Sequence, residues 1–492
     1  MKRQKPSLQQ ICEDSGHDEC TGAGSNGERS AQPAILSAAE VASWLPFTEL
    51  PAPAERKTRL RQQLLDSGCS TPAQAGGRRW AMGCVSLEIT QRCNLDCTLC
   101  YLSENAEAVR DLPIEEVFRR IDMIHAHYGP ATDVQVSGGE PTLRKREELI
   151  AIVARIAALG MRPALFTNGI RATRALLSEL ADVGLCDVAF HVDITQQRAG
   201  YADEAALNVV RETYIERARG LPLMVIFNTT VCATNFAALA SLARFFVRHA
   251  DVVGFASFQL QAATGRGVLR ERDQIISADT TITQIRLGTG ADLDFDALAV
   301  GHPHCNRYAL SLVVGDTVHD VNVNRTLTAK VLTHLGDTSF PRTDRRAARK
   351  AIAALLCRHP DLWWPTLKAL AGFAWRARRD LVAARGRVHK LSFFVHNFMD
   401  AQHIERERAH ACVFMVATAQ GPLSMCVHNA KRDSFVFASL DLVTPRGVER
   451  WDPLRPPPGD SSGRTVAVFP LKWMRGRARA ALAAYPRSTP KI

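Results

Sequence analysis

Three cysteines near residue 95 have the spacing of a metal-binding loop. The segment QRCNLDCTLCY at 91–101 places Cys93, Cys97 and Cys100 within eight residues, directly after the β-prone run VSLEIT. Thiolate sulfur is a soft ligand that suits zinc or iron–sulfur clusters. A [4Fe–4S] cluster normally takes four cysteines, so three would leave one iron open to a further ligand. A structural zinc site and an incidental group of cysteines are the alternatives.

A second segment, DVQVSGGEPTL at 133–143, ends a predicted strand with Gly138, Gly139, Glu140 and Pro141. Two glycines let backbone groups approach a ligand closely. The carboxylate of Glu140 can help to hold a cationic amine. Taken alone, the GGE triplet is also typical of an ordinary turn.

Other predicted strands also end in polar residues, each of which is either a ligand contact or a strand-end cap. These residues are Asn168, Asp193, Asn228, Thr230 and Gln259.

Strands and helices alternate from residue 85 to about residue 260. The predicted strands are VSLEIT, DVQVSGG, RPALFTNG, LCDVAFHVDI, LPLMVIFNTTV and VVGFASFQLQ, with amphipathic segments between them. Continuous apolar strands that alternate with helices favour a parallel sheet. The sequence therefore predicts an α/β fold: a partial (β/α)6 TIM-like barrel with an irregular α+β C-terminal extension. The site is expected at the C-terminal ends of the strands.

Composition shifts suggest five regions along the chain. They are a disordered tail at 1–32, an N-terminal helical extension at 33–80, the partial barrel at 81–262, a C-terminal auxiliary-cluster and substrate region at 263–450, and a linker with a basic tail at 451–492. The second region is expected to hold a helix around Ala54–Ser67 and a loop at 70–79.

Bulk properties exclude some classes of protein. The 492 residues contain no run of eighteen apolar residues, which predicts no membrane span, and the N-terminal segment MKRQKPSLQQ lacks the apolar stretch of a secretory signal. Thirteen cysteines, an odd count, favour metal ligands over a disulfide framework, so a cytoplasmic location is expected. The net charge of +11 comes without a nucleic-acid signature, and no nucleic-acid partner is predicted.

Basic helices with three tryptophans, Trp363, Trp364 and Trp375, are predicted at 342–390. Amphipathic basic helices can rest on a membrane surface, which would make the protein membrane-peripheral. The alternative is a packed helical pair with solvated Arg faces.

The cysteine loop and the GGEP segment together resemble the radical S-adenosylmethionine (SAM) enzymes, whose signature is CxxxCxxC. The resemblance implies a [4Fe–4S] cluster on Cys93, Cys97 and Cys100, with the amino and carboxylate groups of SAM as the fourth ligand. An electron from the cluster then cleaves SAM to methionine and a 5′-deoxyadenosyl radical, which abstracts hydrogen from a substrate. A flavodoxin- or ferredoxin-type electron donor is implied as a partner. The GGEP segment would contact the SAM amino group, and Asn168, Asp193 and Asn228 other parts of SAM.

Cysteines in the C-terminal region suggest a second metal site. Cys305, Cys412 and Cys426 lie beside histidines and polar turns, although free cysteines are often buried small hydrophobes. With a fourth ligand, these thiolates could hold an auxiliary [4Fe–4S] cluster. Candidates for that ligand are Cys357, His302, His304 or a bound substrate.

The same region resembles the tetraether lipid synthases and the related dihydropterin-methylating radical SAM enzymes. The residues that carry this resemblance are His396, Phe398, Met399, Asp400, Arg408, Cys412, Gly421, Pro422, Cys426 and Asn429, with His302, Pro303 and Cys305 of an HPxC element, Phe258–Gln259 and Gly265–Arg266.

Two departures from that group stand out. The group usually has a rubredoxin-like iron site before the first strand, whereas this chain has only Cys69 and Cys84 there, so that iron is predicted to be missing. A cysteine that usually precedes HPxC is replaced at about Val300. Both losses weaken an assignment to tetraether formation.

The leading hypothesis is hydrogen abstraction from an unactivated C–H bond, with C–C bond formation between lipid chains as one outcome. The second is alkylation or another modification of a small, pterin-like molecule or a peptide. The third is a non-enzymatic iron–sulfur or zinc scaffold protein.

Overall fold

The computed structural model describes residues 33–56, 62, 65–67, 69, 83–267, 270–322, 324–334, 345–444 and 447–454. The predicted tail at 1–32, the loop at 70–79 and nearly all of the tail at 451–492 lie outside these residues, as does much of the helix expected around Ala54–Ser67. The elements below all belong to the unit that begins at Ile35.

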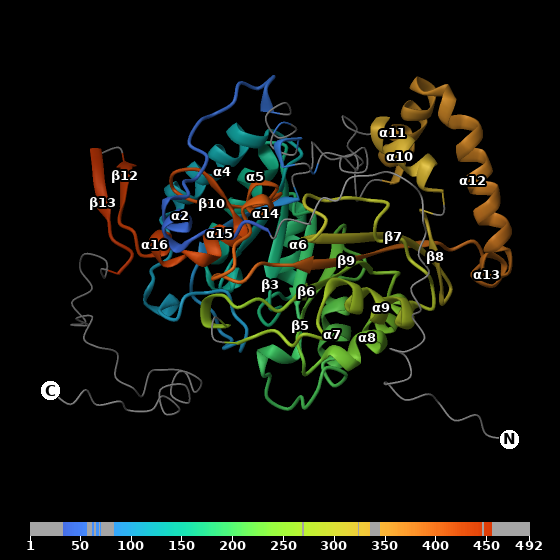
Figure 1. Ribbon diagram of the computed structural model, residues 1–492, viewed down its shortest axis with the longest axis horizontal. Helices are drawn as coiled ribbons and strands as arrows, with labels where there is room; N and C mark the ends of the chain where they lie inside the picture. Colours follow the sequence, from blue (N-terminus) through green and yellow to red (C-terminus); the bar gives the residue numbers. More distant parts are fainter. Residues whose placement is uncertain are drawn as a thin grey trace, which may run out of the picture. The chain divides into compact units, whose positions relative to one another are not determined.

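Six strands and their helices form the predicted alternation (Figure 1). The strands are β1 (Cys84–Thr90), β2 (Asp133–Gly138), β3 (Arg162–Thr167), β4 (Asp187–His191), β5 (Met224–Val231) and β6 (Val253–Leu260). The helices that follow them are α4 (Ile114–Tyr128), α5 (Arg146–Ala158), α6 (Arg174–Asp182), α7 (Asn208–Ala218), α8 (Leu239–Arg248) and α9 (Ala278–Thr289).

Burial explains why these segments form strands and helices in this order. All seven residues of β1 are buried, as expected for a parallel strand covered on both faces. On α4, the buried Val117, Ile121 and Ile124 follow one another at helical spacing. They pack with Val134 and Val136 of β2 in the main hydrophobic core. The periods of burial in strand and helix therefore place one layer of helices against the sheet.

The sheet is open and includes strands from the C-terminal region. Its order is β11-β10-β1-β2-β3-β4-β5-β6-β9-β7-β8, with parallel pairing from β1 to β6. The predicted α/β fold with a partial six-unit series is confirmed. The sheet also continues across the boundary predicted at residue 262, because β9 (His389–Asn397) pairs in parallel with β6 and β10 (Phe414–Ala417) with β1.

The remaining C-terminal elements extend from the two edges of the sheet. One edge carries β7 (Asn306–Val314) and β8 (Thr317–Asp320), followed by α10 (Arg325–His334), α11 (Arg345–Arg358), α12 (Trp363–Arg376) and α13 (Arg378–Ala383). The other carries β11 (Pro422–Ser424), α14 (Arg406–His410), α15 (Met425–Ala430), α16 (Asp433–Val436) and the hairpin of β12 (Leu440–Thr444) and β13 (Gly447–Trp451). A short helix, α2 (Ala38–Ser43), contributes Val41 to a small core with Met399 and Val427.

Among the described residues, no helix combines the length and the apolar character needed to cross a membrane.

Candidate functional site

The cysteine loop follows β1 and opens onto a large cavity. Cys93, Cys97 and Cys100 are each half-buried, and all three line the cavity, whose volume is about 1060 Å³. Two backbone hydrogen bonds hold the loop over the sheet. The Thr98 N–H donates to the carbonyl of Thr195 after β4 (2.8 Å), and the Cys100 carbonyl accepts from the N–H of Arg266 after β6 (2.9 Å). The loop is therefore fixed between strand ends that are far apart in sequence.

The two glycines at the end of β2 lie against the beginning of this loop. Gly138 has a φ of +120°, and a Cβ there would lie 2.0 Å from the carbonyl oxygen of Thr90. A Cβ on Gly139 would lie 2.1 Å from the carbonyl oxygen of Arg92. Any side chain at either position would displace the cysteine loop. The hydroxyl of Tyr101 donates to the Gly138 carbonyl at 2.7 Å, which joins the two segments again.

Glu140 does not line the cavity, in contrast to the amine contact predicted from the sequence. Its side chain is fully buried. Oε1 accepts hydrogen bonds from the hydroxyl groups of Thr142 (2.6 Å) and Thr167 (2.7 Å), and Oε2 accepts from the backbone N–H of Asn168 (2.7 Å). The carboxylate thus ties the end of β2 to the end of β3. Pro141 is also buried behind the cavity wall.

The other predicted SAM contacts divide into two groups. Asn168 and Asn228 line the cavity, and Asn168 Nδ2 donates to Asn94 Oδ1 in the cysteine loop at 2.7 Å. Asp193 lies behind the wall, where its carboxylate contacts His191 Nε2 and accepts from the Thr230 N–H, at 2.7 and 2.8 Å. Burial alone would raise the pKa of Asp193. The nearby His191 and the hydrogen bonds to the carboxylate have the larger combined effect, and they lower the pKa to about 2.

Asp193 therefore positions His191, which lines the cavity itself and was not singled out in the sequence. The histidine stands two residues before the aspartate in the segment HVDI, so its presence on the same strand end was visible. Thr230 and Gln259 also line the cavity, as expected for residues at strand ends.

A buried ion pair lies in the same cavity wall as the three cysteines, and the sequence did not predict it. Arg432, at the start of α16, donates to Glu88 of β1 with N–O distances of 2.8 and 2.6 Å. Its guanidinium lies 4.5 Å from the ring centroid of Tyr101, and Nη2 donates to Asn429 Oδ1 at 2.7 Å. Burial raises the pKa of Glu88, but Arg432 and His428 bring it down to about 2. The C-terminal region thus supplies part of the wall beside the cysteines.

The cavity continues from the cysteine loop along the inner face of the sheet to the first residues of the strands. Asp133, Arg162, Asp187 and Met224 line its far end, and each begins a strand. A six-residue strand spans roughly 20 Å at about 3.3 Å per residue. The middle of the cavity is largely apolar, with side chains that include Ala164, Phe166, Ile226, Phe255, Leu310, Phe394, Phe414 and Val416.

The second group of cysteines comes together in the fold. Cys305 precedes β7, Cys412 precedes β10, and Cys426 lies on α15, yet Cys412 is near enough to both other thiols to raise the pKa of Cys305 and of Cys426. Burial raises the pKa of the Cys305 thiol to about 11, although Arg408 Nε donates to its Sγ at 3.2 Å. Burial likewise raises the pKa of Cys426, as do the nearby Cys412 and Cys305.

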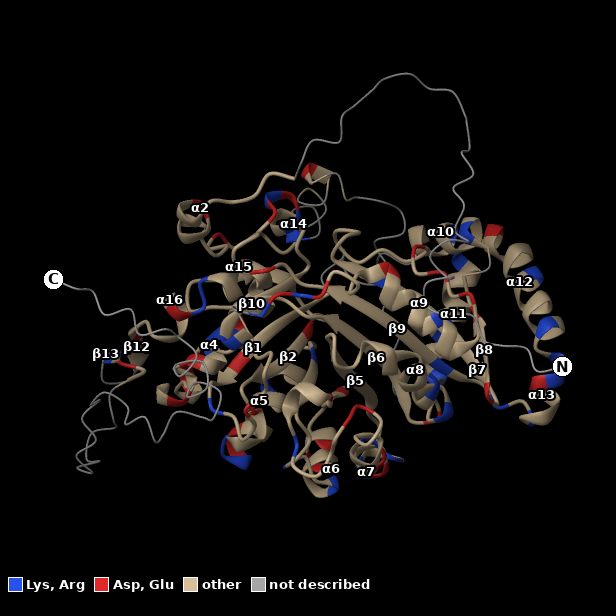
Figure 2. Ribbon diagram, turned by 60° about the horizontal axis from the view of Figure 1, so that its bottom comes forward, with Lys and Arg blue, Asp and Glu red and all other residues tan. Residues whose placement is uncertain are grey.

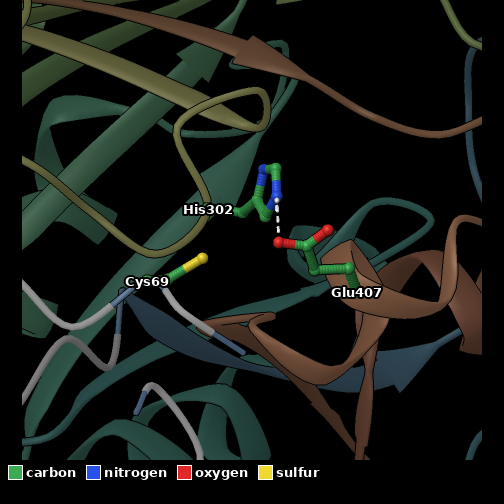
Figure 3. A group of neighbouring side chains, drawn as sticks. All are labelled: Cys69, His302 and Glu407. Atoms are coloured by element: carbon green, nitrogen blue, oxygen red, sulfur yellow. Dashed lines mark ion pairs between the residues drawn. The ribbon is translucent and has the colours of Figure 1, made fainter. Parts of the chain in front are cut away.

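The residues predicted as a fourth ligand for these three cysteines are either on another element or in contact with other side chains. Cys357 is exposed on α11. His302 forms a separate group with Cys69 and Glu407, whose ligand atoms all lie within 4.8 Å of one another (Figure 3). The ring of His304 meets that of His302 edge-on, with the ring centroids 5.1 Å apart.

The group of Cys69, His302 and Glu407 is better explained by hydrogen bonding than by a metal. His302 Nδ1 accepts from the backbone N–H of His304 at 3.1 Å, which leaves the ring proton on Nε2, 3.6 Å from Glu407 Oε1. A metal-binding histidine normally has the reverse pattern, with its second ring nitrogen donating to an oxygen. The thiol of Cys69 donates to the carbonyl of Ser67 at 3.4 Å. The predicted loss of the N-terminal iron site stays a prediction.

The sequence of this chain is similar to those of known proteins. Residues 87–221 match the model of the Radical SAM superfamily. The chain is similar to the 7,8-dihydro-6-hydroxymethylpterin dimethyltransferase of Methanocaldococcus jannaschii, with 28% identity over 188 residues that cover 37% of each chain. It is also similar to the PqqA peptide cyclase of Bradyrhizobium diazoefficiens, with 38% identity over 125 residues, 25% of this chain and 31% of the relative. The matches span about a third of these relatives.

Among solved structures, the chain is similar to Streptococcus suis SuiB bound to the precursor peptide SuiA. The match has a TM-score of 0.32 and 15% identity, and it covers 46% of this chain and 49% of that one.

Proposed function

We propose that the chain is a radical SAM enzyme whose cluster ligands are Cys93, Cys97 and Cys100, since residues 87–221 match the model of the Radical SAM superfamily. The observation that carries this proposal is the position of the three thiols, which share one cavity with the glycines at the end of β2. A partly buried set of three soft sulfur donors fits a [4Fe–4S] cluster with one open iron.

When bound, the cluster supplies the electron that cleaves SAM and so starts hydrogen abstraction from an unactivated C–H bond. The protein's own residues bind and orient the reactants. Backbone groups at Gly138 and Gly139 can approach a ligand closely, while Asn168 and Asn228 offer amides at the cavity wall. His191, held by Asp193, offers a further polar group. The aromatic side chains deeper in the cavity exclude water from the reacting carbon.

An apolar chain is the substrate that the cavity favours. The polar groups of the cavity lie near the cysteine loop and at its far end, whereas Phe166, Phe255 and Phe394 line the part between them. An extended acyl chain can lie along this part with its C–H bonds unactivated by neighbouring polar groups. Formation of a C–C bond between lipid chains is the outcome we propose for the substrate radical.

A pterin-like small molecule or a peptide is the second candidate class. Polar groups at the far end of the cavity favour it, since Arg162 Nε lies 2.9 Å from Asp133 Oδ1 and both side chains line the wall. Such a pair can bind a ring with donors and acceptors on adjacent atoms. The similarity to a dihydropterin dimethyltransferase and a peptide cyclase supports the same class.

Anaerobic incubation with SAM and dithionite tests the proposal, with 5′-deoxyadenosine as the measured product. Dithionite stands in for the physiological reductant, for which we propose a flavodoxin- or ferredoxin-type protein. The substrate class is then tested by adding phospholipid, a dihydropterin or a peptide and measuring which one increases product release. An iron-loaded protein that releases no 5′-deoxyadenosine under any of these conditions would favour a scaffold role instead.

A further inference from the structure

Helix α12 presents an apolar stripe to solvent. Trp363, Leu367 and Leu370 recur at spacings of four and three residues, and each is more than half exposed. Trp364 and Trp375 flank this stripe, with 76% and 70% of their surface exposed. None of the helix's fourteen residues is buried. A globular protein normally covers a face of this kind, which marks it as an interaction surface.

The same segment contains most of the chain's net positive charge. Residues 345–390 have twelve Lys and Arg residues and two Asp, a formal net charge of +10, whereas the whole chain carries +11. Figure 2 shows this charge along α11, α12 and α13. Arg378 lies 4.4 Å from the ring centroid of Trp375, so a cation lies directly beside the apolar stripe.

We propose that α11–α13 dock onto the surface of an anionic lipid bilayer. Tryptophan combines an apolar ring with a polar N–H and is enriched where a membrane meets water. Helices with a basic polar face and Trp or Leu on the other face lie in that interface. Each Lys or Arg adds attraction to anionic headgroups. An acidic protein partner would match the charge but would not need three exposed indole rings.

The docking surface is connected to the candidate site. The half-buried Phe373 of α12 meets the ring of His319 of β8 edge-on, and the same histidine pairs with Asp380 at 3.3 Å. Leu355 of α11 packs with Leu332 of α10, and Leu332 also lines the cavity. Docking would therefore bring the far part of the cavity close to lipid. This last step rests on the proposed lipid substrate, whereas the docking itself does not.

Sedimentation of the full chain with vesicles tests the docking. We expect binding to phosphatidylcholine vesicles that contain phosphatidylglycerol, much weaker binding to phosphatidylcholine alone, and loss of binding as salt increases. The double variant Trp364→Gln/Trp375→Gln should bind about tenfold more weakly. A charge variant, Arg349→Glu/Lys350→Glu, should bind at least about 25-fold more weakly, since each of the two basic residues contributes roughly fivefold.

Matched controls separate the surface from general effects. Arg171→Glu/Arg248→Glu makes the same charge change at exposed positions outside α11–α13 and should leave vesicle binding nearly unchanged. All variants should release 5′-deoxyadenosine as the wild type does, so loss of docking and loss of catalysis are measured apart. Equal sedimentation of the tryptophan variant and the wild type would overturn the proposal. So would a dimer in solution that the tryptophan variant dissociates, because that result assigns the stripe to a second copy.

Discussion

The carboxylate of Glu140 accepts a hydrogen bond of 2.7 Å from the backbone N–H of Asn168. This bond links the ends of two neighbouring strands directly behind the cavity wall. The side chain of Asn168 then reaches Asn94 in the cysteine loop. The glutamate of the GGEP segment therefore acts on the site by fixing the backbone around it.

The variant Glu140→Ala should weaken SAM binding about 10- to 100-fold while the iron content stays unchanged. It should also lower the free energy of unfolding by about 1–3 kcal/mol, because it leaves buried donors without an acceptor. Calorimetric titration with SAM and urea unfolding measure the two effects. Glu147→Ala, an exposed position on the following helix, is the matched control. Unchanged SAM affinity in the Glu140 variant would refute the role of Glu140 in fixing the backbone around the site.

The variant Asp193→Asn should also reduce SAM affinity, by about tenfold, because His191 loses its charged partner. Iron content should not change, since Asp193 lies away from the three cysteines in sequence and behind the cavity wall. Asp182→Asn, exposed at the end of α6, serves as the control. If His191→Gln and the Asp193 variant have independent, additive effects on affinity, Asp193 does not act through the histidine.

The Glu88–Arg432 pair should make the free energy of unfolding depend on pH in the acidic range. The pKa of Glu88 falls from 4.5 to about 2 in the folded protein, which corresponds to about 3 kcal/mol. A lowered pKa stabilises the fold above about pH 4.5, and this contribution is lost as pH falls toward 2. The difference in unfolding free energy between wild type and Glu88→Gln should therefore shrink from about pH 6 to about pH 3. A difference that stays constant over this interval would contradict the shift.

The cysteines Cys305, Cys412 and Cys426 are predicted to hold an auxiliary cluster. The wild type should then bind about eight irons per chain, and the triple Ala variant about four. That variant should still cleave SAM, because Cys93, Cys97 and Cys100 lie on a different loop, but it should not convert the true substrate. Iron analysis and Mössbauer spectra compare the two proteins. Equal iron in both would show that these cysteines are only buried side chains.

The alternation of strands and helices from β1 to β6 could be predicted because its signals are local. Each strand has its own apolar run, and each helix its own periodic stripe, as in Val117, Ile121 and Ile124. The partners of β9 and β10 could not be predicted in the same way. Their pairing with β6 and β1 joins residues more than a hundred positions apart, and nothing in either strand alone specifies an edge.

The candidate site shows the same division. The spacing of Cys93, Cys97 and Cys100 is a local pattern, so the loop was found from sequence. The role of Glu140 depends on Thr167 and Asn168 of another strand, which the sequence does not place next to it. Arg432 was missed because its partner, Glu88, lies 344 residues away. Burial by distant segments thus decides which polar groups face the cavity and which support it.

The most direct test is the release of 5′-deoxyadenosine by reconstituted protein that carries Ala at Cys93, Cys97 and Cys100. Cys186→Ala/Cys232→Ala removes two thiols that flank β4 and β5 and do not line the cavity, and it is the matched control. With SAM and dithionite under anaerobic conditions, the wild type and the control should release the product. The triple variant should release none and should lose about four irons. Release by the triple variant at the wild-type rate would contradict the assignment of these cysteines to the radical SAM cluster.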